Sequence, residues 1–148
     1  MRRGFKIMAL IGALLGVVAL GGTAGAGPGP DRPVAGVADV GIQVNHNGVC
    51  EVGEVCLYFN SGCQGSFADF EFDVPDFAPY TFVSAGAGRG QGVKNNAASA
   101  RNRDTTWIAD IHFNSNYGGS RDRIARTGNC QNLVNTYNEN ASLKWRLS

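Results

Sequence analysis

The stretch LYFNSGCQGS, from Leu57 to Ser66, recurs further along the chain as IHFNSNYGGS, from Ile111 to Ser120. The two copies share Phe, Asn, Ser, Gly and Ser at equivalent places, at an offset of 54 residues. A supersecondary unit that is used twice indicates that each unit has too little apolar surface to close a core by itself. The sequence therefore predicts a duplicated fold whose two halves share one interior.

A second, weaker repeat accompanies the first. KNNAASA, over 94–100, resembles YNENASL, over 137–143. The distance between the two landmarks is longer in the first copy, and the glycine-rich segment SAGAGRGQG, over 84–92, accounts for the excess. This segment lacks the Lys-Ser/Thr ending of a phosphate-binding loop. We expect it to be a flexible surface loop.

The regions around the repeats have the alternation of half-buried strands. In the second copy, Trp107, Ala109, Ile111 and Phe113 are predicted to face inward, whereas Asp110 and His112 face solvent. In the first copy, Leu57 and Phe59 take the inward places, and further on Phe70, Phe72 and Val74 alternate with Asp69, Glu71 and Asp73. No window has a helical period. The pattern predicts an all-β sandwich or barrel.

The N-terminal region has the composition of an export signal. Arg2, Arg3 and Lys6 precede an apolar run from Ile7 to Leu20, and small residues follow at 24–26. The run is shorter than the roughly 20 residues that a membrane-spanning helix needs. We therefore expect a signal peptide over 1–26, a flexible Gly/Pro-rich linker over 27–44 and a secreted domain over 45–148, with copy one at about 49–105 and copy two at about 106–148.

The charge of the chain excludes one class of partner. The formal net charge is +1, and removal of the three basic residues of the predicted signal peptide lowers it to −2. Such a balance does not attract nucleic acid or an anionic membrane. We expect no nucleic-acid partner, no membrane association after signal cleavage, and a monomer.

The four cysteines, Cys50, Cys56, Cys63 and Cys130, all lie in the predicted secreted part. An oxidising compartment favours disulfides over free thiols, but four cysteines allow three pairings and the sequence does not decide among them. The preferred pairing joins Cys50 to Cys56 and Cys63 to Cys130. A zinc site is not expected, because Cys63 and Cys130 lack the paired spacing of zinc ligands.

Within the repeats, a more specific resemblance emerges. Tyr58, Cys63 and Gly65 in copy one correspond to His112, Tyr117 and Gly119 in copy two, and each copy is followed by a turn and a serine, Ser99 or Ser142. This spacing resembles the Greek-key motif of βγ-crystallins, although each copy departs from it at one aromatic position. A glycine supplies the positive φ that lets the hairpin fold over, and the serine pins it by hydrogen bonds. The resemblance implies a double Greek-key sandwich or barrel with two disulfides.

Within that superfamily, GVCEVGEVCLYFNSGCQGSFADF is similar to the secreted bacterial proteins of peptidase inhibitor family thirty-six. Those proteins open their domain in the same way, with two nearby cysteines that lead into a Leu-Tyr strand. The resemblance covers roughly Asn45 to Ser148. It implies an inhibitor of metalloproteinases and an extracellular protease as partner, rather than an enzyme.

A rigid, disulfide-braced loop can occupy a protease cleft with little loss of entropy. Two segments are candidates for such a loop. The first is the loop inside the short cysteine pair, and the second is the segment near Cys130. We take the first as the inhibitory loop, comprising Glu51, Val52, Gly53, Glu54 and Val55.

Calcium binding without inhibition, as in a structural or stress protein, is the alternative function. Members of the βγ-crystallin superfamily often bind the ion through an Asn/Asp pair followed by Ser/Thr-Ser, and oxygen ligands suit Ca²⁺. In this chain, Ala100 and Leu143 replace the last serine. We expect no cofactor beyond a weak calcium site, whose ligands would be Asn95, Asn96 and Ser99 in copy one and Asn138, Glu139 and Ser142 in copy two.

Catalysis is the third class of function that we consider. Asp69, Glu71 and Asp73 could be imagined as an acid/base pair, but alternating acids beside phenylalanines are typical of a solvated strand face. No nucleophile, base and orienting group can be assembled from the chain. We expect no enzymatic activity.

Overall fold

A computed structural model describes residues 46–147. The predicted signal peptide over 1–26 and the predicted linker over 27–44 lie outside these residues. The described part contains seven strands and no helix, and so no helix that could span a membrane. The strands are β1 (Val55–Asn60), β2 (Gln64–Phe70), β3 (Ser99–Asn102), β4 (Trp107–Asn114), β5 (Gly118–Ile124), β6 (Cys130–Asn132) and β7 (Ser142–Leu147).

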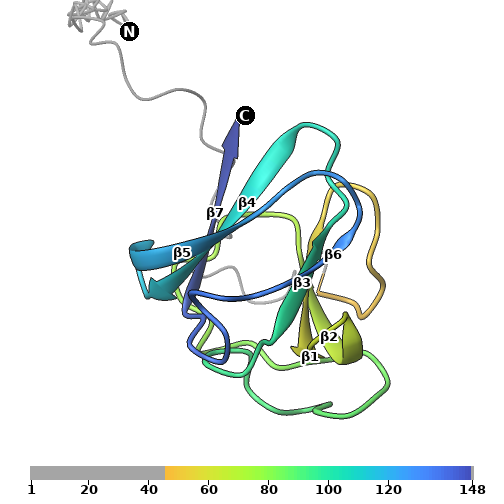
Figure 1. The fold of residues 1–148 in the computed structure, drawn as a ribbon. Coiled ribbons are helices and arrows are strands. Elements are labelled where there is room, and N and C mark those ends of the chain that lie inside the picture. Colours follow the sequence, from red (N-terminus) through yellow and green to blue (C-terminus); the bar gives the residue numbers. More distant parts are fainter. Residues whose placement is uncertain (1–45, 148) are drawn as a thin grey trace, which may run out of the picture.

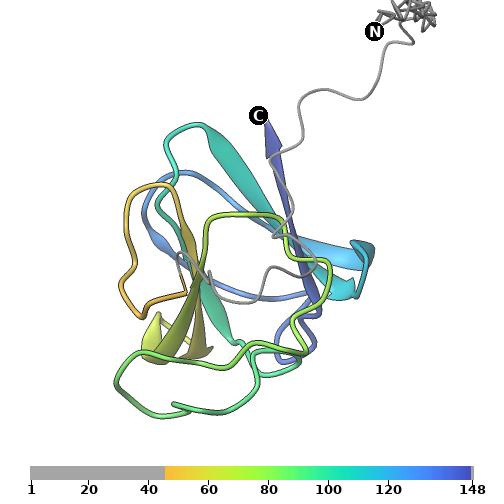
Figure 2. The same ribbon diagram turned by 180° about the vertical axis from the view of Figure 1, so that it is seen from behind.

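The strands form two antiparallel sheets, which Figures 1 and 2 show as two layers. The first sheet has the order β2-β1-β3-β6, and the second has the order β5-β4-β7. In each sheet a hairpin, β1–β2 or β4–β5, pairs with the last strand of the same half, β3 or β7. The two halves thus repeat one arrangement, as the duplicated sequence predicts.

Each half also contributes to the other half's sheet. β6, which belongs to the second half, pairs with β3 of the first. In return, Val74 of the first half forms an antiparallel bridge to Leu143 on β7, with N–O distances of 2.9 and 2.8 Å. This exchange completes two Greek keys. All-β architecture with paired motifs is therefore confirmed.

The repeated sequence corresponds to the folded-over hairpins. The pairing register shifts between Tyr58 and Asn60 in β1, and at the equivalent place between His112 and Asn114 in β4. The backbone turns through positive φ at equivalent positions, with 77° at Gly65 and 76° in the second copy at Gly119. Glycine adopts this conformation without steric cost, which explains why both copies retain it.

A serine hydroxyl holds each corner. Ser99 Oγ accepts a hydrogen bond from the amide of Cys63 at 2.9 Å and donates one to the carbonyl of Asn60 at 2.6 Å. In the second copy, Ser142 Oγ accepts from Tyr117 N at 3.0 Å and donates to Asn114 O at 2.7 Å. Each hydroxyl satisfies two backbone groups that the turn removes from the strand ladder.

The core lies between the two sheets and draws on both halves. Its fully buried side chains include Leu57, Phe77, Phe82, Ile111, Ile124, Leu143 and Trp145. Two disulfides add covalent links, Cys50–Cys56 and Cys63–Cys130, as preferred from the sequence. The second joins the first hairpin to the exchanged strand β6. By the chain-entropy relation, the loop it closes contributes about 4 kcal/mol, against about 2 kcal/mol for the short loop.

The expected solvent face of β4 is not exposed. Asp110 and His112 are buried, and Phe113, predicted to face inward, is 40% exposed. Arginine side chains of β5 and β7 pair with Asp110, and the folded-over hairpin explains the burial of His112 and the exposure of Phe113. It covers the outer face of the sheet near His112, whose ring meets that of Tyr117, and the register shift after His112 turns Phe113 away from the interior.

The acids predicted to line a solvated strand face are also placed differently. Strand β2 ends at Phe70, and both Asp69 and Asp73 are fully buried. Asp73 accepts hydrogen bonds from the amide of Trp145 at 2.7 Å and from Lys144 Nζ at 2.6 Å. A buried carboxylate is tolerated where such donors compensate for lost water. These acids support distant backbone rather than face solvent.

The glycine-rich segment 84–92 is packed against the first hairpin. Ser66 N donates to Ala87 O at 2.8 Å, and Ser66 Oγ donates to Ser84 O at 2.6 Å. A Cβ at Gly88 would lie 2.2 Å from the ring of Phe59, so this position needs glycine for close approach. The expectation of a flexible loop does not describe these contacts.

We predict that Ser99→Ala and Ser142→Ala each lower the free energy of unfolding by about 2 kcal/mol. Each substitution leaves a partly buried amide and carbonyl of the hairpin corner without their side-chain partner. Urea unfolding measures the change, with Ser120→Ala, on the exposed part of β5, as the matched control. A loss no larger than the control's would contradict the assigned role of the serine.

Candidate functional site

The loop between Cys50 and Cys56 is exposed at Glu51 and Val52, whereas Glu54 and Val55, also predicted to belong to the inhibitory loop, are buried. Its ends are joined by the disulfide, and β1 begins inside it at Val55. Val52, at its tip, is 67% exposed. An exposed apolar side chain on a braced loop is suited to enter a pocket of a partner protein.

Backbone contacts hold the loop against the residues after β3. The amide of Arg103 donates to Glu54 O at 2.7 Å, and the amide of Gly53 donates to Arg103 O at 3.3 Å. The guanidinium of Arg103 also donates to the carbonyl of Cys50. No local sequence pattern marks Arg103, because nothing in the residues around it shows that the chain after β3 returns to this loop.

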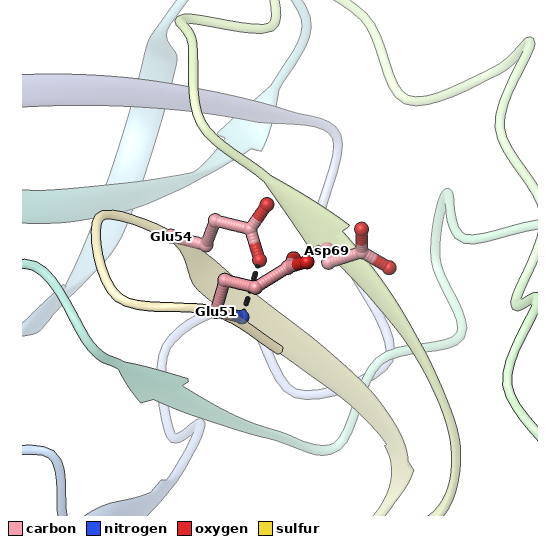
Figure 3. A group of neighbouring side chains, drawn as sticks. All are labelled: Glu51, Glu54 and Asp69. Carbon is pink, nitrogen blue, oxygen red and sulfur yellow. Dashed lines mark hydrogen bonds between the residues drawn. The ribbon is translucent and has the colours of Figure 1, made fainter. Parts of the chain in front are cut away.

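Three carboxylates lie close together at the loop. Figure 3 shows Glu51 and Glu54 on the loop and Asp69 on the neighbouring strand β2, and one oxygen from each lies within 4.8 Å of the others. Glu54 Oε2 accepts a hydrogen bond from the amide of Glu51 at 2.7 Å. Asp69 accepts from the amides of Asn47 and Gly48 at 2.8 and 2.9 Å. The carboxylates therefore brace the backbone on both sides of Cys50.

Burial dominates the electrostatics of the two buried carboxylates, Glu54 and Asp69. Desolvation raises the pKa of Glu54 from 4.5 to about 7, the hydrogen bond from Glu51 N opposes the rise, and the negative charges of Asp69 and Glu51 add to it. Desolvation likewise raises the pKa of Asp69, against the two amide hydrogen bonds that it accepts. Glu54 thus changes charge near neutral pH within the Cys50–Cys56 loop.

The second candidate segment, near Cys130, is organised by a different residue. The carboxylate of Asp122 accepts hydrogen bonds from the amides of Val134, Asn135 and Thr136 and from the Thr136 hydroxyl, at 2.8–3.2 Å. Burial opposes ionisation of Asp122, but these donors outweigh it and lower the pKa of this carboxyl. Val134 projects from the segment and is 79% exposed. Asp122 was also missed, since a single acid in a strand carries no motif.

The residues proposed as calcium ligands form two equivalent turns. Asn95 and Asn138 have positive φ of 61° and 53°, and the turns are linked by Asn95 N to Asn140 O at 2.8 Å and Asn138 N to Ala97 O at 2.9 Å. Asn96 donates to the carbonyls of Gly92 and Lys94. Glu139 is exposed. The hydroxyls of the two serines in these sets are engaged at the hairpin corners.

Comparison with known proteins gives a family match. A family model, peptidase inhibitor family I36, matches residues 45–124. Among solved structures, the chain is similar to one described as "Evolution of the eye lens beta-gamma-crystallin domain fold", with 17% identity, 73% of this chain and 95% of that chain covered, and a TM-score of 0.48. No curated protein matches the chain.

The raised pKa of Glu54 predicts that stability falls as pH rises. Between about pH 4.5 and 7 the folded state binds more protons than the unfolded state, so the contribution of Glu54 is complete at low pH and is lost on approach to pH 7. Glu54→Gln removes the buried charge but keeps an acceptor for Glu51 N. We expect this variant to melt several degrees above the parent chain at pH 8 and at the same temperature at pH 4.5.

The control for this prediction is Glu139→Gln, which changes an exposed glutamate on the β6–β7 connection. It removes the same charge from the chain without relieving a buried group. Equal effects of the two substitutions at pH 8 would show that net charge, rather than burial of Glu54, sets the pH dependence.

Proposed function

The chain belongs to peptidase inhibitor family I36, and from this membership we propose that it inhibits a metalloproteinase by presenting the Cys50–Cys56 loop to the active-site cleft. The family match supports the inhibitory function. The N-terminal basic residues and apolar run support secretion, so that the target would be an extracellular protease. We propose that the inhibitor acts as a monomer.

One observation carries the loop assignment. Val52 is exposed at the tip of a loop whose backbone is fixed by a disulfide and by the paired contacts of Arg103 with Gly53 and Glu54. Such a loop loses little conformational entropy on binding. If the loop is cut, the disulfide keeps both ends in the cleft, which favours resealing over release of product.

In the proposed mechanism, the loop inhibits the protease by occupying its active-site cleft. In a metalloproteinase, the zinc ion polarises the scissile carbonyl and activates water. We propose that Val52 fills an apolar subsite beside that centre, while the hydrogen bonds of Arg103 hold the flanking backbone. This role is one of binding, and requires no catalytic group from the chain.

The first test of this proposal is a titration of the purified secreted domain against a thermolysin-like metalloproteinase, with a serine protease alongside. We expect the inhibition constant for the metalloproteinase to rise about 100-fold in Val52→Asp, since a charge cannot enter an apolar subsite without a desolvation cost. Val134→Asp is the matched control. It changes a similarly exposed valine in the β6–β7 connection, which Figures 1 and 2 show as a segment separate from the Cys50–Cys56 loop.

The outcomes of this titration test the inhibitory function and the assignment of the contact to the Cys50–Cys56 loop separately. If a large molar excess of the unaltered domain inhibits neither protease, inhibition of these classes is refuted. If Val134→Asp abolishes inhibition and Val52→Asp does not, the function stands but the contact lies in the segment near Cys130.

The alternative proposal, weak calcium binding, has less support from the contacts. Ser99 and Ser142 already use their hydroxyls at the hairpin corners, and the next residues, Ala100 and Leu143, are buried apolar side chains. We expect the melting temperature to change by less than about 1 °C between millimolar calcium and chelator, because a weakly bound ion stabilises little. A rise of several degrees that magnesium does not reproduce would favour the calcium function.

A further inference from the structure

The outer face of the sheet β5-β4-β7 carries a concentrated positive charge. Three arginines, Arg121 and Arg123 on β5 and Arg146 on β7, surround the fully buried carboxylate of Asp110 on β4. Their Nε atoms lie 3.1, 3.1 and 3.0 Å from its oxygens, and the side chains are 46%, 54% and 49% exposed. We call these four residues the arginine cluster.

The charges within the cluster do not balance. Three guanidinium groups face one carboxylate, and within residues 46–147 no other acidic side chain pairs with any of the three. Lys144, on the same face of β7, is paired with Asp73 and so adds no net charge. Because each arginine approaches Asp110 through Nε, the cluster presents guanidinium groups to solvent with an excess of two positive charges.

The duplication supplies an internal comparison. In the first sheet, the positions equivalent to Asp110, Arg121 and Arg123 hold Cys56, Phe67 and Asp69. There, Tyr58 and Phe67 pack ring against ring at 5.2 Å. The same motif therefore folds without a charged cluster at this place. Since burial of a carboxylate is costly, the cluster calls for an explanation other than the fold.

A buried imidazole lies next to the cluster. His112 is directly opposite Arg121 in the strand register and is 3% exposed. Neither of its ring nitrogens has a hydrogen-bond partner in the described part of the chain. Burial lowers its pKa, the charge of Asp110 opposes this, and Arg121 and Arg146 lower the pKa further. An unpaired buried polar group of this kind is uncommon and costs stability unless a ligand or water satisfies it.

We propose that the arginine cluster, together with His112, is a binding site for a tetrahedral oxyanion, a phosphate or a sulfate group. Arginine forks bind such groups through several charge-assisted hydrogen bonds. The guanidinium donors come from two strands, β5 and β7, on either side of β4. Donors from several directions suit an anion with at least three acceptor oxygens better than they suit a planar carboxylate. This site is separate from the Cys50–Cys56 loop, and its test does not depend on protease inhibition.

The experiment is a proton NMR titration of the histidine rings with inorganic phosphate and with sulfate, at an ionic strength held constant with chloride. The chain has two histidines, and His46, whose ring stacks on Phe70 of the first half, serves as an internal reference for His112. We expect the His112 signals to shift with saturation in the millimolar range, typical of a few exposed charge-assisted contacts, while those of His46 do not. Shifts of both rings, or shifts without saturation, would overturn the proposal.

Variants then assign the site. Arg121→Gln combined with Arg146→Gln should weaken anion binding at least 10-fold, whereas Arg89→Gln, an exposed arginine in the 84–92 segment, should leave it unchanged. If the double variant does not fold, Arg121→Lys with Arg146→Lys keeps both charges and tests the fork geometry, with a smaller but measurable loss expected. Binding that is unaffected in every arginine variant would refute the assignment.

A comparison of polymers with free ions shows whether the oxyanion is a free ion or a group carried on a polymer. Polyphosphate and dextran sulfate are compared with the free ions, and polyglutamate and neutral dextran serve as controls. If the affinity per phosphate or sulfate group is at least 10-fold higher for a polymer than for the free ion, the ligand is a group carried on a polymer, because a polymer offers several groups to the site at once. Equal binding identifies the free ion. Polyglutamate binding as tight as that of the sulfated polymer would refute a tetrahedral ligand.

Discussion

The exchange of strands between the two halves is the constraint on which the rest of the structure depends. β6 completes the sheet of the first half, and Val74 extends the sheet of the second by pairing with Leu143. Neither half therefore has a complete sheet, or a closed apolar interior, without the other. The Cys63–Cys130 disulfide secures this arrangement, because it links the corner of the first hairpin to the strand that the second half contributes.

The buried polar groups follow from the same arrangement. Hairpins that fold over their own sheets leave amides and carbonyls outside the strand ladder, and Ser99 and Ser142 satisfy them in matched fashion. Asp69 and Asp122 accept hydrogen bonds from amides of loops, and Asp73 accepts one from the amide of Trp145 in strand β7. In this small domain, polar side chains thus form the hydrogen bonds that irregular backbone needs, since a loop without such partners would leave its amides and carbonyls unsatisfied.

The two halves keep the same backbone but carry different surfaces. On the first half, the position equivalent to Asp110 is a cysteine that braces an exposed loop, with an acidic group beneath it. On the second half, the same face carries the arginine cluster, and His112 stands at the position that Tyr58 occupies in the first half. Because the shared apolar core constrains the inner faces more than the outer ones, the outer faces of a duplicated fold can diverge toward separate binding roles.

The sequence by itself determined the duplication, the all-β class and the hairpin corners, because these depend on local patterns: a repeat, a period of two and glycine at a positive-φ turn. It left three pairings of the four cysteines open, and the tertiary structure decided for the preferred one. The tertiary structure alone decided which polar residues are buried, how Arg103 holds the Cys50–Cys56 loop, and that Arg121, Arg123 and Arg146 meet at one carboxylate. Alternation assigned Asp69 and Asp110 to solvent, since it indicates two faces of a strand but not what later covers the outer one. Contacts between residues far apart in the chain set that burial, and no local pattern encodes them.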